Sequence, residues 1–95
     1  MSGDIAALRR ELDEIDRELT KLFERRMEVS RRVAEYKREN NLPVLDASRE
    51  EQVLCSRVEM LSDKTLEQSA RALFMEIMRL SRLAQESMLN RGDEL

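Results

Sequence analysis

Charged side chains interrupt the apolar pattern of this chain at helical intervals. Arg26 follows Leu22 by four residues and precedes Val29 by three, so it occupies a position where the pattern requires an apolar side chain. Lys37 lies on the flank of the same stripe, and Arg9 lies on that flank near its other end. Because burial of an unpaired guanidinium is very costly, we expect an anionic group to meet Arg26.

Polar residues further along the chain could contribute to the same chemistry. Asp46, Arg49 and Glu50 are spaced i, i+3, i+4 and therefore share one helix face. Ser81 and Gln85 form an i, i+4 pair beside the apolar stripe of a later helix. Cations, a hydroxyl, a carboxamide and a carboxylate would then converge on one helical core. A small, anionic, oxygen-rich ligand would require such a set of groups.

Each of these residues also has an ordinary structural explanation. A core glutamate could neutralise Arg26, and solvent could hydrate Lys37 and Arg9 on the helix flank. Asp46 alone suits a helix N-cap. The other four fit exposed helix charges or small polar side chains at a helix crossing: Arg49, Glu50, Ser81 and Gln85. The combination, rather than any single position, indicates a binding site.

Composition excludes several classes of function. The chain has no histidine and one cysteine, Cys55, so Ser/His/Asp and Cys/His nucleophiles are excluded and a zinc site is not expected. We expect no metal and no cofactor. The net charge is only −3 with both signs interspersed, which gives no footprint for nucleic acid or an anionic membrane. Without a spanning apolar run or a signal-peptide core, we expect a cytoplasmic protein with no membrane partner.

Strong helix formers dominate the chain, which contains two glycines and one proline in 95 residues. We therefore expect one all-α domain, residues 1–95, with three helices. The first should run from about 4 to 40, where two asparagines and Pro43 stop it. The second should start with Asp46 or Ser48 as N-cap and reach about 61. Thr65, in a capping box with Gln68, should open the third, which continues to about 88.

The first of these helices is too long for a compact monomer. About 36 residues extend roughly 54 Å, whereas a compact chain of this length has a radius of gyration of about 12 Å. Its apolar seam alternates steps of three and four over about five heptads. The two shorter helices cannot cover that stripe, so a partner chain is implied. The seam comprises Ile5, Leu8, Leu12, Ile15, Leu19, Leu22, Val29, Val33 and Tyr36.

Taken together, these motifs resemble the all-helical bacterial chorismate mutases. The likeness comprises the segment Leu8–Asp16, Arg25-Arg26 followed eleven residues later by Lys37, the proline-led segment Pro43–Glu50, and Ser81 with Gln85. It covers essentially the whole chain. It implies an intertwined, antiparallel homodimeric bundle that rearranges chorismate to prephenate for phenylalanine and tyrosine biosynthesis. The implied substrate-binding residues are Arg9, Arg26, Lys37, Asp46, Arg49, Glu50, Ser81 and Gln85.

The resemblance also implies a role for each residue. Arg26 and Ser81, with an Arg9 from the partner chain, would bind the two carboxylates. Lys37 and Gln85 would be catalytic, donating to the ether oxygen, while Glu50 would accept from the ring hydroxyl. Asp46 and Arg49 would shape the loop end of the site.

Helix geometry supports a site shared between two chains. Arg9 and Arg26 are 17 residues apart on one helix, about 25 Å, which two arginine side chains cannot span around so small a ligand. If Arg9 serves the site of Arg26 and Lys37, it must therefore come from the partner. Antiparallel pairing would place it opposite about residue 31, with the dyad near Thr20.

Two alternatives remain open at this stage. An isochorismate-pyruvate lyase of the same fold would use the same cations on a sister substrate. A non-catalytic helical dimerisation module would carry these charges for structural reasons only. The chain is equally consistent with a stand-alone enzyme and with one domain of a fusion with another enzyme of the pathway, and it shows no separate effector site.

Overall fold

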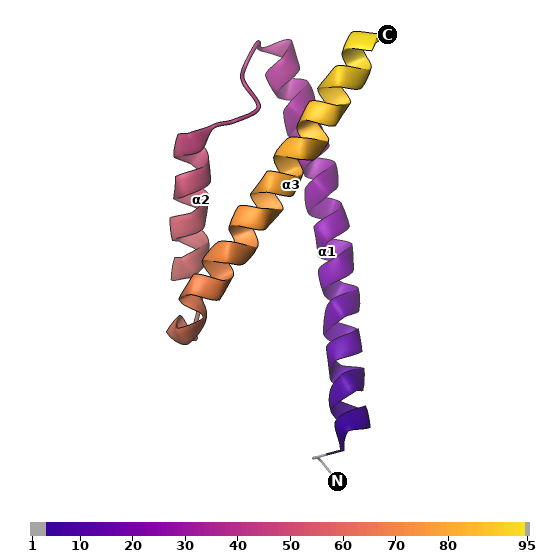
Figure 1. The fold of residues 1–95 in the computed structure, drawn as a ribbon, viewed down its shortest axis with the longest axis vertical. Helices are drawn as coiled ribbons and strands as arrows, with labels where there is room; N and C mark the ends of the chain where they lie inside the picture. The colour runs from indigo at the N-terminus through magenta and orange to yellow at the C-terminus, as the bar shows by residue number, and fades with distance from the viewer. Residues whose placement is uncertain (1–3, 95) are drawn as a thin grey trace.

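A computed structural model describes the backbone of residues 4–94 and the side-chain environments of residues 4–89 (Figure 1). The elements in chain order are α1 (Ile5–Glu39), α2 (Ala47–Glu59), a short 3-10 helix η1 (Lys64–Leu66) and α3 (Glu67–Glu94). The described chain contains no strand. The expected all-α class with one very long helix is therefore confirmed.

Both ends of α1 are capped by residues that lie next to the helix in the sequence. Asp4 is the N-cap, and its Oδ1 accepts a hydrogen bond from the backbone N–H of Ala6 at 2.9 Å. After the helix, Asn41 takes a left-handed conformation with φ of 54°, which asparagine tolerates better than most residues. The N–H of Leu42 then donates to the carbonyl of Lys37 at 2.8 Å, closing a Schellman-type end. The chain thus reverses direction directly above the last turn of α1.

Helix α2 begins directly after Asp46, which is one of the two residues predicted as its N-cap. The Asp46 side chain accepts from the backbone N–H of Arg49 at 3.0 Å, so Asp46 rather than Ser48 is the N-cap. The helix ends at Glu59, close to the predicted end near residue 61.

The predicted start of the third helix is wrong in detail. Asp63, not Thr65, caps this segment, because its Oδ1 accepts from the backbone N–H of Thr65 at 3.0 Å and from the Thr65 hydroxyl at 2.6 Å. The hydroxyl is then used as a donor, and the expected capping box with Gln68 does not form. A turn of 3-10 helix precedes α3, which begins at Glu67. It continues to Glu94, past the predicted end at Met88, since no proline interrupts it.

Helix α3 packs against both other helices and joins them into one unit (Figure 1). It crosses the C-terminal half of α1, and its N-terminal half lies beside α2. The apolar core lies between α2 and α3, where Val53, Leu54 and Met78 are buried against Phe74. Between α1 and α3 the buried side chains are mostly polar: Ser30, Ser81 and Gln85, with Ala34 beside them.

The N-terminal half of α1 extends away from the other helices (Figure 1). The chain measures 58 × 29 × 14 Å with a radius of gyration of 17.2 Å, well above the value of about 12 Å for a compact chain of this length. Six large apolar side chains on this half are 44–57% exposed: Ile5, Leu8, Leu12, Ile15, Leu19 and Leu22. The expectation that the shorter helices leave this stripe uncovered is confirmed. Full burial of each such side chain would contribute about 1.5–3 kcal/mol.

Candidate active site

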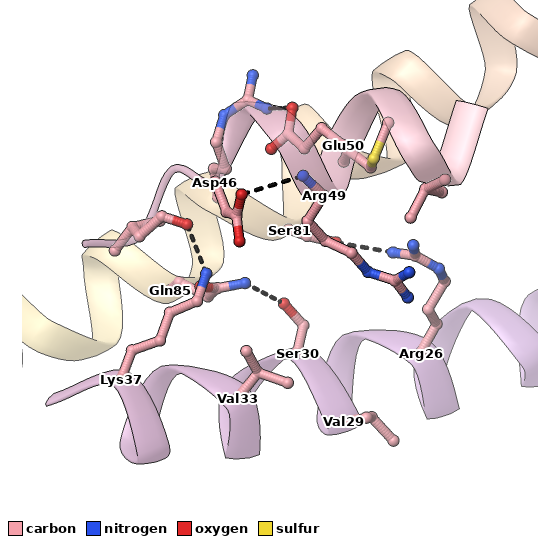
Figure 2. Close-up of a pocket in the computed structure, with 14 residues that line it drawn as sticks. Arg26, Val29, Ser30, Val33, Lys37, Asp46, Arg49, Glu50, Ser81 and Gln85 are labelled. Carbon is pink, nitrogen blue, oxygen red and sulfur yellow. Dashed lines mark hydrogen bonds and ion pairs between the residues drawn. The ribbon is translucent and has the colours of Figure 1, made fainter. Parts of the chain in front are cut away.

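A cavity of about 280 Å³ lies where the C-terminal half of α1 faces α2 and α3 (Figure 2). All three helices and the loop before α2 contribute to its walls. Valine and methionine side chains form the apolar part: Val29, Val33, Val44, Val53 and Met78. Polar and charged side chains from each of the three helices line the remaining part of the cavity. Such a mixture of apolar walls and a few convergent polar groups is typical of a small-molecule site.

Helix α1 presents Arg26 at one end of the cavity. Its Nη1 donates to the Ser81 hydroxyl of α3 at 3.1 Å, and Figure 2 shows the side chain rising from α1 toward that residue. The pKa of the guanidinium lies below its usual value, chiefly because burial removes water and then because Arg57 and Arg49 repel its charge. An arginine nevertheless remains protonated at physiological pH. Arg26 is thus a partly buried, charged donor.

Lys37 stands three turns further along α1, at the other end of the cavity. Its Nζ donates to the backbone carbonyl of Val44 at 2.5 Å and lies 3.5 Å from Oε1 of Gln85. Both acceptors are neutral. The reversal of the chain after α1 produces this geometry, since it brings the Val44 carbonyl within hydrogen-bond distance of the lysine.

The carboxamide of Gln85 is oriented from both sides. It is buried at 7% exposure, and its Nε2 donates to the Ser30 hydroxyl at 2.9 Å. Its Oε1 faces the Lys37 ammonium. Since Nε2 carries two hydrogens, Ser30 occupies one and leaves the other for a further acceptor.

The N-cap and the first turn of α2 contribute three charged residues. Asp46 is occupied in part as the N-cap, while the Arg49 guanidinium contacts Gln52 at 3.1 Å. The Glu50 carboxylate forms an ion pair with Arg82 of α3. Figure 2 shows the side chains of Asp46, Arg49 and Glu50 above the cavity, opposite α1.

The charges around the cavity do not balance. Four cationic and two acidic side chains line it, a formal excess of two positive charges. Among the side chains that the structure describes, no carboxylate pairs with Arg26, Lys37 or Arg49. Within the described residues of one chain, no core glutamate neutralises Arg26. A dianionic ligand would restore the balance.

Seven of the eight residues singled out from the sequence line this one cavity, and Arg9 is the exception. Arg9 is exposed on the N-terminal half of α1, 17 positions before Arg26. Within one chain it does not reach the cavity. The seven are Arg26, Lys37, Asp46, Arg49, Glu50, Ser81 and Gln85.

Sequence reasoning missed two polar residues of the cavity, Ser30 and Arg82. Ser30 follows Arg26 by four residues on the same helix face, so its spacing could have revealed it. Arg82 follows Ser81 directly, and its pairing depends on how close α2 lies to α3. The spacing of residues within one helix does not predict this pairing between helices.

The described residues offer neither a metal site nor a membrane-spanning helix. In this part of the chain no group of three or more His, Cys, Asp or Glu side chains could hold a metal ion. No helix among the described residues is both long enough and apolar enough to span a bilayer.

A comparison with protein families gives a match over most of the chain. A family model described as chorismate mutase type II matches residues 8–86, which include every residue of the cavity and Arg9. The corresponding searches of curated proteins and of solved structures gave no match.

Proposed function

The chain belongs to the chorismate mutase type II family, and we propose that its cavity rearranges chorismate to prephenate in the biosynthesis of phenylalanine and tyrosine. Family membership supports an isomerase activity of this general kind. The observation that carries the proposal is the charge of the cavity, which has two cations in excess, while no carboxylate among the described side chains pairs with Arg26 or Lys37. Chorismate carries two carboxylates and would neutralise that excess.

The reaction suits a site in which donors, cations and apolar walls predominate and two carboxylates are present. Chorismate rearranges in one unimolecular step, in which a C–O bond breaks as a C–C bond forms. No proton transfer or nucleophile takes part. A protein can lower the barrier by holding the compact diaxial conformer of the substrate. It can also aim donors at the ether oxygen, where negative charge grows as the bond stretches.

The two ends of the cavity suggest how its cations divide these tasks. Arg26 binds a carboxylate, together with the Ser81 hydroxyl that already contacts it at 3.1 Å. Arg9 of the partner subunit contributes to carboxylate binding from outside the chain. These contacts hold the two carboxylates at a fixed separation, which favours the compact conformer.

Lys37 and Gln85 donate to the ether oxygen in this mechanism. Among the described residues Lys37 contacts neutral acceptors, and one N–H of the Gln85 amide is not taken by Ser30. Loss of one preorganised donor of this kind typically lowers the rate by about 10²–10³-fold. Glu50 accepts from the ring hydroxyl, and Asp46 and Arg49 close the loop end of the site.

We further propose that the active species is an antiparallel homodimer whose long first helices pair with each other. The uncovered apolar seam of α1 supports this assembly, since a second copy of α1 would cover it. The distance along the helix supports it as well. Arg9 and Arg26 are 17 positions apart, about 25 Å, so Arg9 can serve such a cavity only in another chain.

The direct test is the loss of chorismate absorbance in the presence of the purified protein. Turnover to prephenate is expected, and the Lys37→Ala variant should lose about 10³-fold in kcat/KM while keeping its helical circular dichroism. Formation of salicylate and pyruvate from isochorismate, without mutase turnover, would instead identify a lyase. Absence of any turnover, with no protection from unfolding by a bicyclic transition-state analogue, would identify a non-catalytic module.

A further inference from the structure

Glu50 is held by a residue of another helix. Its carboxylate forms an ion pair with Arg82 of α3, and both side chains line the cavity. The Glu50 and Arg82 side chains are only 25% and 31% exposed. Solvent therefore screens this pair less than an ion pair on the open surface.

The pair leaves part of the carboxylate available. Nη1 of Arg82 contacts Oε1 of Glu50, and no described hydrogen bond involves Oε2. A carboxylate has acceptor capacity on both oxygens, so a ligand hydroxyl can bind while the arginine stays in place. A glutamate side chain without such a partner would distribute among several rotamers.

A second ion pair joins the same two helices outside the cavity. Arg71 of α3 contacts Glu51 of α2 at 3.2 Å, with both side chains largely exposed. The apolar contact of Val53 and Leu54 with Met78 also holds α2 against α3. The Glu50–Arg82 pair is therefore one of several links between these helices, and of the two ion pairs it is the one that lines the cavity.

From these contacts we propose that Arg82 is a positioning residue, which holds the Glu50 carboxylate in the orientation that accepts the ring hydroxyl of chorismate. This inference rests on the proposed function. Arg82 itself neither binds the substrate carboxylates nor donates to the ether oxygen. Its effect on the reaction passes through Glu50 alone.

The experiment compares kcat and KM for chorismate in the full-length wild type, Arg82→Met and Arg82→Lys. The ring hydroxyl lies on the carbon next to the one whose C–O bond breaks, but its own bonds do not change in the rearrangement. Its contact is therefore expected to be made equally in the ground and transition states. Arg82→Met should therefore raise KM about 10-fold and change kcat less than about 3-fold. Because a single nitrogen makes the contact, Arg82→Lys should bring KM back to within about 3-fold of the wild-type value.

Arg71→Met is the matched control, because it removes an arginine of α3 that pairs with a neighbouring glutamate of α2 outside the cavity. Its KM and kcat should equal those of the wild type. Thermal unfolding of all variants should show that each is folded. If Arg82→Met does not fold, Arg82→Gln provides a second neutral variant, and the same rise in KM is expected.

Two further measurements separate positioning from a general effect on charge. In a Glu50→Gln background, Arg82→Met should change KM less than about 2-fold, because the two residues act as a unit. With a chorismate analogue that lacks the ring hydroxyl, the wild type and Arg82→Met should have the same KM. The inference is wrong if Arg82→Met raises KM as much in the Glu50→Gln background, or with that analogue, as it does in the otherwise wild-type protein with chorismate.

Failure of the inference and failure of the proposed function give different results. If the wild type converts chorismate and Arg82→Met, or Arg82→Gln in its place, keeps the wild-type KM, the positioning role is wrong and the mutase assignment stands. If the wild type does not convert chorismate, the proposed function and this inference are both wrong.

Discussion

The amide of Gln85 donates from Nε2 to the Ser30 hydroxyl at 2.9 Å, so two buried polar side chains meet between α3 and α1. This contact determines which end of the amide faces the Lys37 ammonium. The donor that the mechanism requires of Gln85 is thus oriented by a hydroxyl on the opposite helix. Ser30 and Lys37, seven positions apart on α1, hold the amide between them.

Ser30→Ala should lower kcat/KM for chorismate, because the Gln85 amide loses the hydroxyl that orients it. Loss of the hydroxyl leaves the amide free to turn, and an intramolecular hydrogen bond contributes about 0.5–1.5 kcal/mol, so kcat/KM should fall about 3–10-fold. Steady-state kinetics with chorismate measures the change. The control is Ser87→Ala, which removes an exposed hydroxyl of α3 and should leave the kinetics unchanged. Unaltered kinetics in Ser30→Ala would show that Ser30 does not orient the amide.

Gln85→Glu should make the reaction depend on acid. An ionised carboxylate cannot donate to the ether oxygen, and it would pair with the Lys37 ammonium next to it. Above the pKa of the new carboxyl, each unit of pH lowers the protonated fraction about 10-fold, so kcat/KM should rise steeply as the pH falls. The measurement is a pH–rate profile from about 4 to 8 beside that of the wild type. A flat profile for the variant would remove Gln85 from the reaction.

Arg26→Met should separate stability from function. Burial and the neighbouring Arg57 and Arg49 lower the pKa of Arg26, so the fold disfavours its charged form. A basic group whose pKa is lower in the folded state costs stability while it is charged, and this cost begins to fall only when the pH rises above that pKa. For an arginine this lies well above neutral, so the cost should be constant between about pH 5 and 9. Without ligand, Arg26→Met should therefore unfold at the same temperature as the wild type or higher.

The same variant should no longer respond to a dianionic ligand. As the product of the proposed reaction, prephenate is expected to bind the folded state and to raise the unfolding temperature of the wild type by mass action. In Arg26→Met that rise should largely disappear, and kcat/KM should fall at least 10²-fold. Calorimetry with and without prephenate measures both effects. Equal protection of the two proteins would show that Arg26 does not bind the ligand.

The sequence predicts best where one local pattern decides the outcome. The heptad seam from Ile5 predicts α1 and its uncovered stripe, and the i, i+4 spacing predicts that Ser81 and Gln85 share a face. The start of α3 was predicted wrongly because two capping side chains compete within three residues, and the carboxylate of Asp63 takes both donors of Thr65. Periodicity does not resolve that competition.

Contacts between two helices cannot be predicted from the spacing of residues within one helix. The face that carries Arg26 and Ser30 follows from spacing, but the 2.9 Å contact of Ser30 with Gln85 depends on where α3 crosses α1. The pairing of Glu50 with Arg82 depends in the same way on α2 and α3. Distances between helices, unlike faces, arise from packing of the whole chain.

The last prediction concerns the chain that supplies Arg9. Arg9→Ala and Lys37→Ala should each be nearly inactive alone, because every site of either homodimer lacks one cation. Mixed, unfolded and refolded together, they should form hybrid dimers. In a hybrid, the cavity of the Arg9→Ala chain keeps its own Lys37 and receives Arg9 from the Lys37→Ala chain. Random pairing gives half hybrids with one intact site each, so about a quarter of wild-type activity should return.

The matched control replaces Arg9→Ala with Arg26→Met. Arg26 and Lys37 line the same cavity of one chain, so a mixture of Arg26→Met with Lys37→Ala contains no intact site in any dimer. That mixture should stay as inactive as its components. Because both mixtures carry one variant of α1 in each chain, general effects of refolding on the helix should be equal in them. If activity returns in neither mixture, Arg9 acts in its own chain's site or outside the reaction. If activity returns only in the mixture that contains Arg9→Ala, the site is shared between two chains.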